Sequence, residues 1–195
     1  KRWKVSKKPV PNNDFVDRTI KWTAELEDHL TKGSLLKFDE TCIVKSFYRP
    51  FVKQFFYFDR IITHRIYQNE NIFGPRNLYK NQIIAVNVSG KGFDVLASRS
   101  LVDFHFSGDT QCLPLYRYDK NGKRLDNITD WALQRFKDHY SSNLTGLEDL
   151  SGLQKLDIFH YVYAVLHCPW YRQPYEVNLK RDFPRIPYYP NFWQW

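Results

Sequence analysis

Cationic and amide side chains gather in one stretch of the sequence, residues 60–81. Arginine pairs with guanine, and asparagine or glutamine pairs with adenine, when such side chains reach base edges in the major groove of DNA. Gly74-Pro75 interrupts the stretch, as is typical of a loop. The candidate base-reading residues are Arg60, Arg65, Gln68, Asn69, Asn71, Arg76, Asn77 and Asn81.

The preceding stretch, residues 48–60, interleaves cations with aromatic rings. We expect Phe51, Phe55 and Phe58 to belong to the hydrophobic core, which aromatic side chains often dominate. The arginines allow two interpretations: they contact DNA, or they only cover the edge of a sheet. DNA contact is favoured for Arg60, Arg65, Gln68, Asn69 and Asn71, which lie where strand-like segments give way to a loop, because recognition loops need a rigid scaffold.

Strand-like runs on both sides of the polar stretch would supply that scaffold. Each run is rich in Ile, Val, Phe and Tyr, which favour strands. Residues 89–92 and 119–122 read Ser-Gly-Lys-Gly and Asp-Lys-Asn-Gly, which indicate turns. The predicted strands are residues 42–47, 54–58, 82–88, 93–97 and 112–118.

Helical periodicity appears near both ends of the chain. Residues 14–33 have apolar side chains at helical spacing, with Asp14 as the N-cap and Gly33 after the C-terminus. Three further helices are predicted after the strands. They are residues 131–140 with Thr129 or Asn127 as the cap, residues 155–167 ended by Pro169, and residues 170–180.

These elements predict an α+β fold, a single domain with a mixed or antiparallel sheet and a helical C-terminal part. Because the chain begins at Lys1 and contains no Met, we expect a fragment of a longer polypeptide. The expected divisions are a linker remnant at 1–13 and a domain at 14–195. This domain would comprise a strand-rich part at 42–118, a helical part at 129–181 and an extended C-terminal strap at 183–195.

The charge balance indicates an anionic partner. The 195 residues include 29 Lys and Arg against 21 Asp and Glu, a formal net charge of +8. Such an excess attracts nucleic acid, because each neutralised phosphate releases counterions. The alternative is a basic protein that binds no polyanion.

The apolar segments and the cysteines indicate the cellular compartment in which the chain is expected. No apolar run reaches the roughly 20 residues that span a bilayer, so we expect no membrane association. Cys42, Cys112 and Cys168 are widely separated, which favours the reducing cytoplasm of a bacterium over a disulfide framework.

The motifs of common catalytic sites are missing from the sequence. It has neither a Gly-x-x-x-x-Gly-Lys phosphate loop nor a Gly-x-Gly-x-x-Gly nucleotide fingerprint. His105 and Asp109 have no third ligand at metal-binding spacing. His160 and His167 lie seven residues apart on an apolar helix and are interpreted as core histidines. We therefore expect no catalytic residue, no metal site and no cofactor in this chain.

Three blocks of the sequence carry a resemblance to a known family. The first is Tyr48-Arg49-Pro50-Phe51 followed by Tyr57-Phe58-Asp59, and the second is Asp103-Phe104-His105 followed by residues 112–116. The third comprises residues 157–167, Tyr171-Arg172, Tyr175 and residues 182–187. In this order they resemble the C-terminal specificity domain of Type ISP restriction–modification enzymes, over nearly the whole chain.

The resemblance implies a target-recognition domain of a large polypeptide that also carries a nuclease, a helicase motor and an adenine N6-methyltransferase. Its implied partners are double-stranded DNA and the methyltransferase domain of the same polypeptide. S-adenosylmethionine, ATP and Mg²⁺ would belong to the other domains. We expect the chain itself to be monomeric.

Two further hypotheses stay open beside sequence-specific DNA recognition. The chain could be a structural coupling domain that holds the methyltransferase against the motor and touches DNA only non-specifically. An independent enzyme is disfavoured by the missing motifs. If residues 60–81 contain no base readers, the hairpin near Lys91 or the turn near Lys123 and Arg124 would be the next candidates.

Overall fold

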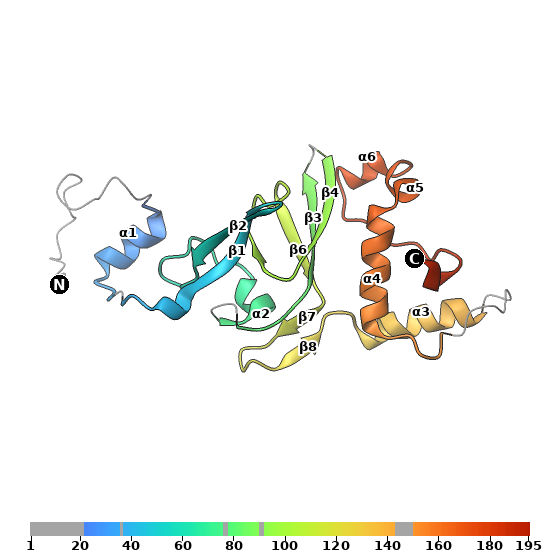
Figure 1. Cartoon of the computed structure of the whole chain (residues 1–195), viewed down its shortest axis with the longest axis horizontal. Coiled ribbons are helices and arrows are strands. Elements are labelled where there is room, and N and C mark those ends of the chain that lie inside the picture. Colours follow the sequence, from blue (N-terminus) through green and yellow to red (C-terminus); the bar gives the residue numbers. More distant parts are fainter. Residues whose placement is uncertain (1–21, 36, 76–77, 90–91, 143–149) are drawn as a thin grey trace.

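The strands form three small sheets in the computed structural model, which describes residues 22–35, 37–75, 78–89, 92–142 and 150–195. The strand orders are β2-β1-β5, β4-β3-β6 and β7-β8, and every pairing is antiparallel except that of β1 with β5 (Figure 1). The strands are β1 (Ile43–Arg49), β2 (Val52–Tyr57), β3 (Ile83–Ser89), β4 (Gly92–Ser98), β5 (Leu101–Val102), β6 (Thr110–Pro114), β7 (Tyr116–Tyr118) and β8 (Arg124–Asp126).

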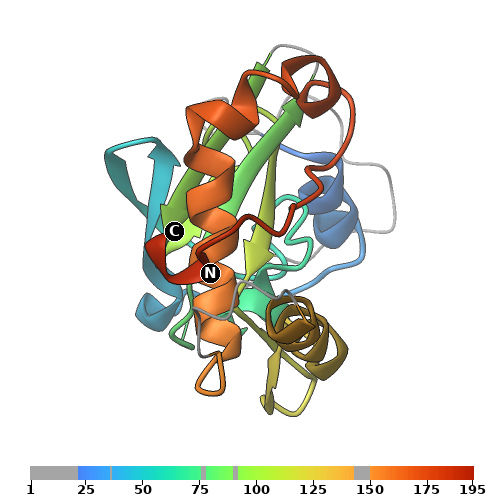
Figure 2. The same cartoon turned by 90° about the vertical axis from the view of Figure 1, so that its right-hand side faces the viewer.

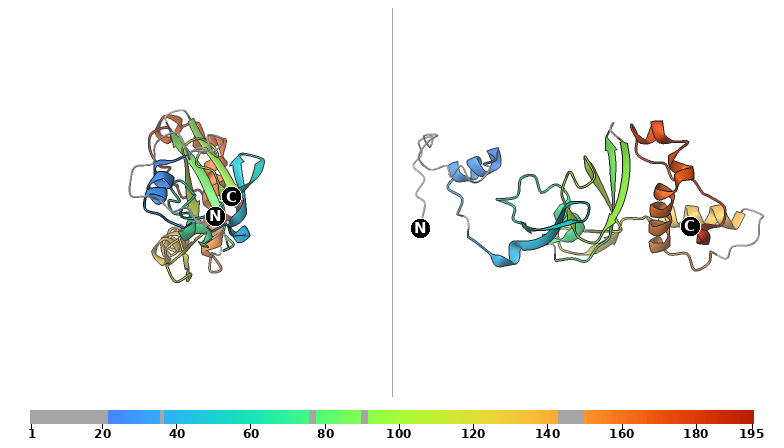
Figure 3. Two further views of the ribbon diagram at one scale, coloured as in Figure 1. Left: turned by 90° about the vertical axis from the view of Figure 1, so that its left-hand side faces the viewer. Right: turned by 45° about the horizontal axis from the view of Figure 1, so that its top comes forward.

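Most helical residues follow the strands. Along the long axis of the molecule, α1 comes first, the sheets lie in the middle and the C-terminal helices lie at the far end (Figure 3). The helices are α1 (Ala24–Thr31), α2 (Asn69–Phe73), α3 (Asp130–Ser142), α4 (Lys155–His167), α5 (Pro169–Arg172) and α6 (Glu176–Leu179), with short 3-10 turns at Glu40–Cys42 and Phe192–Gln194. The predicted α+β class is confirmed.

The central strand β3 separates two hydrophobic cores. Successive side chains of a strand point to opposite faces, so Ile84 and Val86 join the core beneath the C-terminal helices. Ile83 and Ala85 join the second core, which lies among β1, α2 and β5. All four side chains are at most 1% exposed. A strand buried on both faces holds the two halves of the molecule together.

The helical half packs through α4 and the C-terminal strap. Figure 2 shows α4 lying across β3 and β4, and its residues Ile158, Val165 and Leu166 are at most 3% exposed. Tyr140, Tyr161 and Tyr171 donate their hydroxyl hydrogens to backbone carbonyls of the strap, at 2.6–2.9 Å. The helices therefore hold the strap in place by hydrogen bonds as well as by ring contacts.

Within the described residues, the predicted N-terminal helix is represented by α1, which begins at Ala24. Asp14 and residues up to 21 lie outside the described residues, and Thr23 is the N-cap of α1, with its hydroxyl accepting the Leu26 N–H at 3.4 Å. The capping hydroxyl satisfies one of the N–H groups that have no partner in the first turn of the helix. Gly33, with φ +68°, takes the left-handed position predicted after the C-terminus.

Two predicted elements are each divided in the structure. Residues 112–118 form the end of β6 and then β7. The division falls where the Asn81 side chain takes the place of a strand, because its amide bonds the N–H of Tyr116 at 3.1 Å and the carbonyl of Tyr116 at 2.8 Å. Residues 170–180 form α5 and α6 rather than one helix. Pro174 lies between them, and proline cannot donate the backbone hydrogen bond that a continuous helix needs.

Residues 131–140 and 155–167 were predicted more accurately. The first lies within α3, where the Thr129 hydroxyl accepts the Ala132 N–H at 3.1 Å, so Thr129 rather than Asn127 is the cap. The second coincides with α4. No helix in the described part of the chain is long and apolar enough to cross a membrane.

Candidate nucleic-acid interface

The eight predicted base-reading residues lie in different environments. Arg60, Arg65, Gln68 and Asn71 are exposed between the end of β2 and the end of α2, and Asn69 is half-buried there. Arg76 and Asn77 lie outside the described residues. Asn81 is buried, with 5% of its surface exposed. The described members of the segment are therefore brought together on one surface, with the exception of Asn81.

The Asn81 side chain links α2 to β7. Its amide nitrogen donates to the carbonyls of Ile72 at 2.7 Å and Tyr116 at 2.8 Å. Its amide oxygen accepts the N–H of Gln82 at 2.8 Å and of Tyr116 at 3.1 Å. The amide is thus engaged by backbone groups and hidden from solvent. We correct its assignment from base reader to structural residue.

Replacing Asn81 by alanine should lower the free energy of unfolding by about 2 kcal/mol, because buried backbone groups lose their hydrogen-bond partners. Urea unfolding followed by circular dichroism would measure the change. Asn71→Ala is the matched control, since the Asn71 side chain is exposed, and it should have little effect. Equal stability of the two variants would contradict the structural role.

Arg60 is held by an ion pair at the surface. Its Nε lies 2.9 Å from each carboxylate oxygen of Glu70, and its Nη2 also contacts that carboxylate. The Arg60 hydrogen bond holds the pKa of Glu70 below its usual value, and the same bond raises the pKa of Arg60. Because 77% of the Arg60 side chain is exposed, water screens the pair and a phosphate or guanine could replace Glu70.

Two exposed amides lie beside this pair. The Asn71 amide nitrogen donates to the Gln68 side-chain oxygen at 2.5 Å. Gln68 and Asn71 stand one helical turn apart at the start of α2, so their amides point to the same side. Such a pair of amides presents both donors and acceptors, which is the combination that recognises an adenine edge.

The loop between Arg60 and α2 contains strained backbone. Arg65 has φ +53° and Tyr67 has φ +51°, values that residues with side chains rarely adopt. A hydrogen bond with Tyr67 raises the pKa of Arg65. Strain of this kind clusters at binding sites, where the surrounding structure enforces it. The backbone of the loop is therefore held in a defined conformation at Arg65 and Tyr67.

His64 ties this loop to α1. Its Nδ1 lies 2.8 Å from Glu25 Oε2. The pKa of Glu25 is lowered by a backbone hydrogen bond within α1 and by the contact with His64. None of the eight residues of α1 is buried, so this polar contact positions a helix that has little core packing of its own.

Exposed aromatic rings extend the surface to the 103–109 loop. The Tyr67 ring stacks on Phe104, with centroids 6.2 Å apart and an interplanar angle of 17°. The Phe104 ring meets His105 edge-on at 4.8 Å. Tyr67 and Phe104 were missed as site residues. Their exposure is invisible in the sequence, and the only available signal was their position beside the polar residues.

The hairpin β1–β2 adds cations to the same surface. From Ile43 to Phe58 the sequence contains Lys45, Arg49 and Lys53 but neither Asp nor Glu. Arg49 reaches the 103–109 loop, where its Nη1 donates to the His105 carbonyl and lies 3.5 Å from Asp103 Oδ1. Hairpin, loop and polar segment are therefore adjoining parts of one surface.

Two phenylalanines of this hairpin, Phe51 and Phe55, are exposed, which contradicts the prediction that they belong to the core. Phe58 is buried as predicted, with 3% exposed, but Phe51 is 91% and Phe55 is 74% exposed. Phe51 occupies the turn between the strands, and Phe55 lies on β2 at the edge of its sheet, where nothing in the described part of the chain covers it.

The alternative positions for base readers also carry charge. Lys120, Lys123 and Arg124 are exposed on the hairpin β7–β8, and the Arg124 guanidinium lies 4.4 Å from the Tyr116 ring centroid. The Asp119 carboxylate accepts the N–H groups of Asn121 at 2.8 Å and Lys123 at 2.9 Å, which fixes the turn. Lys91 lies outside the described residues.

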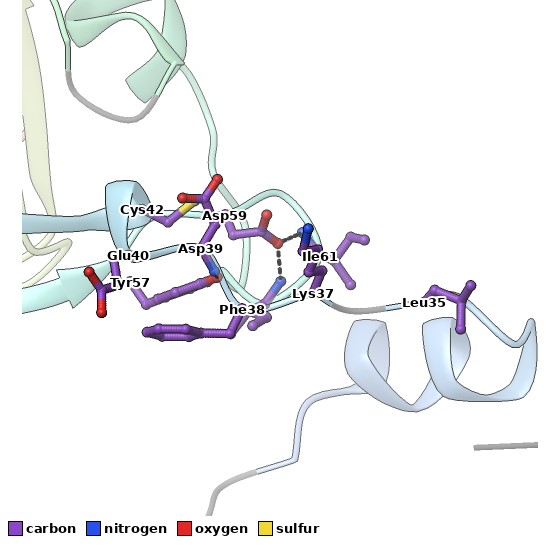
Figure 4. A pocket seen from close by; sticks show the side chains of 10 residues that line it. Leu35, Lys37, Phe38, Asp39, Glu40, Cys42, Tyr57, Asp59 and Ile61 are labelled. Atoms are coloured by element: carbon purple, nitrogen blue, oxygen red, sulfur yellow. Dashed lines mark hydrogen bonds between the residues drawn. The ribbon is translucent and has the colours of Figure 1, made fainter. Parts of the chain in front are cut away.

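A cleft of about 640 Å³ lined by Leu35, by residues within 37–42 and by residues within 57–62 is unsuited to nucleic acid. Figure 4 shows three carboxylates, Asp39, Glu40 and Asp59, on side chains that line it with Lys37. The Asp59 carboxylate accepts the Ile61 N–H at 2.8 Å. A phosphate would be repelled here, so the cationic hairpin is the better surface.

The histidines support no metal site. His160 and His167 are exposed on α4 rather than buried in the core, which corrects the prediction. Burial lowers the pKa of His167, whose ring also interacts with the backbone of Val95 on β4. His105 Nδ1 lies 3.5 Å from Asp109 Oδ1. The described residues include no cluster of three metal-ligating side chains.

Comparisons with known proteins identify the domain. The family model of the Type ISP C-terminal specificity domain matches residues 4–195. The solved cryo-EM structure of the DrdV–DNA complex is 40% identical, with a TM-score of 0.83 over 92% of this chain and 17% of that chain. No curated protein matches.

Two Type ISP restriction–modification enzymes are also similar. A nuclease-deletion mutant of LlaGI in complex with a DNA substrate mimic is 30% identical, with a TM-score of 0.68 over 87% of this chain and 14% of that chain. The ATP-dependent enzyme LlaBIII bound to DNA is 25% identical, with a TM-score of 0.72 over 86% of this chain and 11% of that chain. This chain thus spans less than a fifth of each of the three.

Proposed function

This chain belongs to the Type ISP C-terminal specificity domain family, and we propose that it recognises a base sequence in double-stranded DNA for a restriction–modification enzyme. The three similar structures are complexes with DNA or a DNA mimic. In this role the chain chooses the site and performs no chemistry.

One observation carries the proposal, namely the continuous surface formed by the hairpin β1–β2, the 103–109 loop and residues 59–71. Its hairpin supplies cations that can neutralise phosphates and position the duplex. Its polar segment supplies Arg60, Arg65, Gln68 and Asn71, whose donors and acceptors can read base edges. Asn69 begins α2 and stays a candidate beside them, as do Arg76 and Asn77.

We assign the chemistry to other domains of the same polypeptide. Adenine methylation and DNA cleavage would take place there, with S-adenosylmethionine, ATP and Mg²⁺. The methyltransferase domain would be the protein partner of this chain, which would act as a monomer in the bacterial cytoplasm. Purified chain should accordingly transfer no methyl group from labelled S-adenosylmethionine.

The second candidate function is structural coupling between the methyltransferase and the motor. Apolar side chains on α5 and α6 favour a protein contact at the far end of the molecule, since Trp170 is 84% and Val177 is 64% exposed. Sequence preference separates the two functions. A coupling domain would bind all duplexes alike.

The salt dependence of DNA binding tests the proposal. If the surface neutralises about 4–6 phosphates, the logarithm of the binding constant should fall with the logarithm of salt concentration with a slope near −4 to −5. Fluorescence anisotropy with a labelled duplex would measure it. No binding of the chain at low salt, together with an enzyme indifferent to loss of this domain, would exclude DNA recognition.

A further inference from the structure

The turn between β1 and β2 places a bulky side chain where glycine is usual. Arg49 pairs with Val52, so Pro50 and Phe51 form a two-residue turn. Proline suits the first position of such a turn, but a positive φ at the second position favours Gly or Asn. Phe51 adopts φ +69° there. Its backbone is therefore strained, as is that of Arg65 and Tyr67 across the same surface.

The strain at Phe51 is not offset by burial of its ring. The residue is 91% exposed, and among the large hydrophobic residues that are exposed in the described chain it has the highest value. A shallow groove of about 510 Å³ beside it is lined by Arg49, His105 and Arg172, with Asp94 as its carboxylate. The phenyl ring therefore stands in solvent at the tip of the hairpin.

The charges around the tip indicate which kind of partner this is. Lys45, Arg49 and Lys53 lie on the two strands, which carry no carboxylate. The Lys53 Nζ lies 5.7 Å from the Phe47 ring centroid and the Arg49 guanidinium 4.7 Å from that of Tyr48, so the cations lie along the rings. An apolar tip with cations near it is complementary to a DNA duplex, because the phosphates of a duplex are anionic and its stacked bases are apolar.

We propose that Phe51 is a wedge that inserts between two adjacent base pairs of the bound duplex and bends it. Lys53, next to the turn, and Lys45, farther along the hairpin, would contact phosphates of the same duplex. Apolar side chains that unstack a base step in this way kink DNA and allow it to contact more protein surface. The inference rests on the proposed function, and it adds a deformation of the DNA that base reading alone does not require.

The test compares Phe51→Ala and Phe51→Gly with Phe55→Ala, the matched control on the same hairpin. The probe is a 30-base-pair duplex with a donor and an acceptor dye at its ends, and the same duplex with a two-base mismatch bubble at its centre. The unaltered chain should raise energy transfer by bending the intact duplex. Both Phe51 variants should bind that duplex about ten-fold more weakly and leave it straight.

The bubble and the glycine variant distinguish a wedge from an ordinary contact. A bubble is already unstacked, so it should restore most of the affinity that the Phe51 variants lose. Phe51→Gly should unfold at the same or a higher temperature than the unaltered chain, because glycine adopts φ +69° without strain. Loss of binding in a folded, relaxed variant cannot come from misfolding.

Four outcomes would contradict the proposal that Phe51 is a wedge. They are normal bending by Phe51→Gly, an equal loss on intact and bubble duplexes, an equal loss in Phe55→Ala, and an unbent duplex with the unaltered chain. Each of these requires that the unaltered chain binds DNA. Failure of that chain to bind either duplex would instead overturn the proposed function.

Discussion

Replacing Tyr161 by alanine should lower the free energy of unfolding by about 3–5 kcal/mol, the usual cost of deleting a buried aromatic ring. Tyr161 on α4 is 2% exposed. Its ring stacks on Phe192 with centroids 4.9 Å apart and meets Phe136 edge-on at 5.7 Å. The deletion leaves a cavity where α3, α4 and the strap meet, so the strap should detach in the variant. Urea unfolding would measure the loss.

Tyr161→Phe separates the hydroxyl from the ring. The hydroxyl donates to the Pro187 carbonyl at 2.7 Å and accepts the Tyr189 N–H at 2.8 Å. Its removal should cost about 1–2 kcal/mol, because both backbone groups lose a partner. Tyr175→Ala is the control on an exposed ring and should have little effect. If Tyr161→Phe cost as much as Tyr161→Ala, the hydrogen bonds rather than the ring would hold the strap.

The helical half of the fold was predictable because its signals are local. Residues 155–167 are apolar on nearly every side, the Asp157 carboxylate accepts the Gln154 N–H at 2.8 Å where the helix begins, and Pro169 follows its end. Each of these features acts within one or two helical turns. The division of residues 112–118 between two sheets depends on partners far away in sequence, so the run of strand-forming residues gave no sign of it.

The residue types of the candidate site could be predicted from the sequence, but the exposure of its side chains could not. Asn81 and Asn71 have the same side chain, yet the first bonds buried backbone and the second lies in solvent. The rule that places aromatic rings in the core succeeded for Phe58 and was wrong for Phe51 and Phe55. Burial depends on which elements cover a given face. Here β2 is an edge strand, and its tip has no cover in the described chain.

Replacing Arg65 by alanine should lower discrimination at one base position of the recognition site about ten- to a hundred-fold. The two described arginine candidates differ in their partners, because Arg60 is paired with the carboxylate of Glu70 whereas Arg65 contacts Tyr67. Arg60 can leave Glu70 only by breaking an ion pair. We therefore expect Arg65→Ala to relax the site more than Arg60→Ala does. Sequencing of methylated sites in cells that carry the whole enzyme would reveal the relaxed position.

Two further variants separate base reading from phosphate contact. Arg65→Lys keeps the charge but lacks the planar fork that pairs with guanine, so it should relax the same base position and leave the salt dependence unchanged. Lys53→Ala should weaken binding to every sequence and make the salt slope shallower by about 1. An unchanged methylation site in Arg65→Ala would move the base readers to Lys123 and Arg124 on the hairpin β7–β8. If those substitutions also left the site unchanged, the coupling function would be favoured, because a domain that reads no bases can contribute only contact and position.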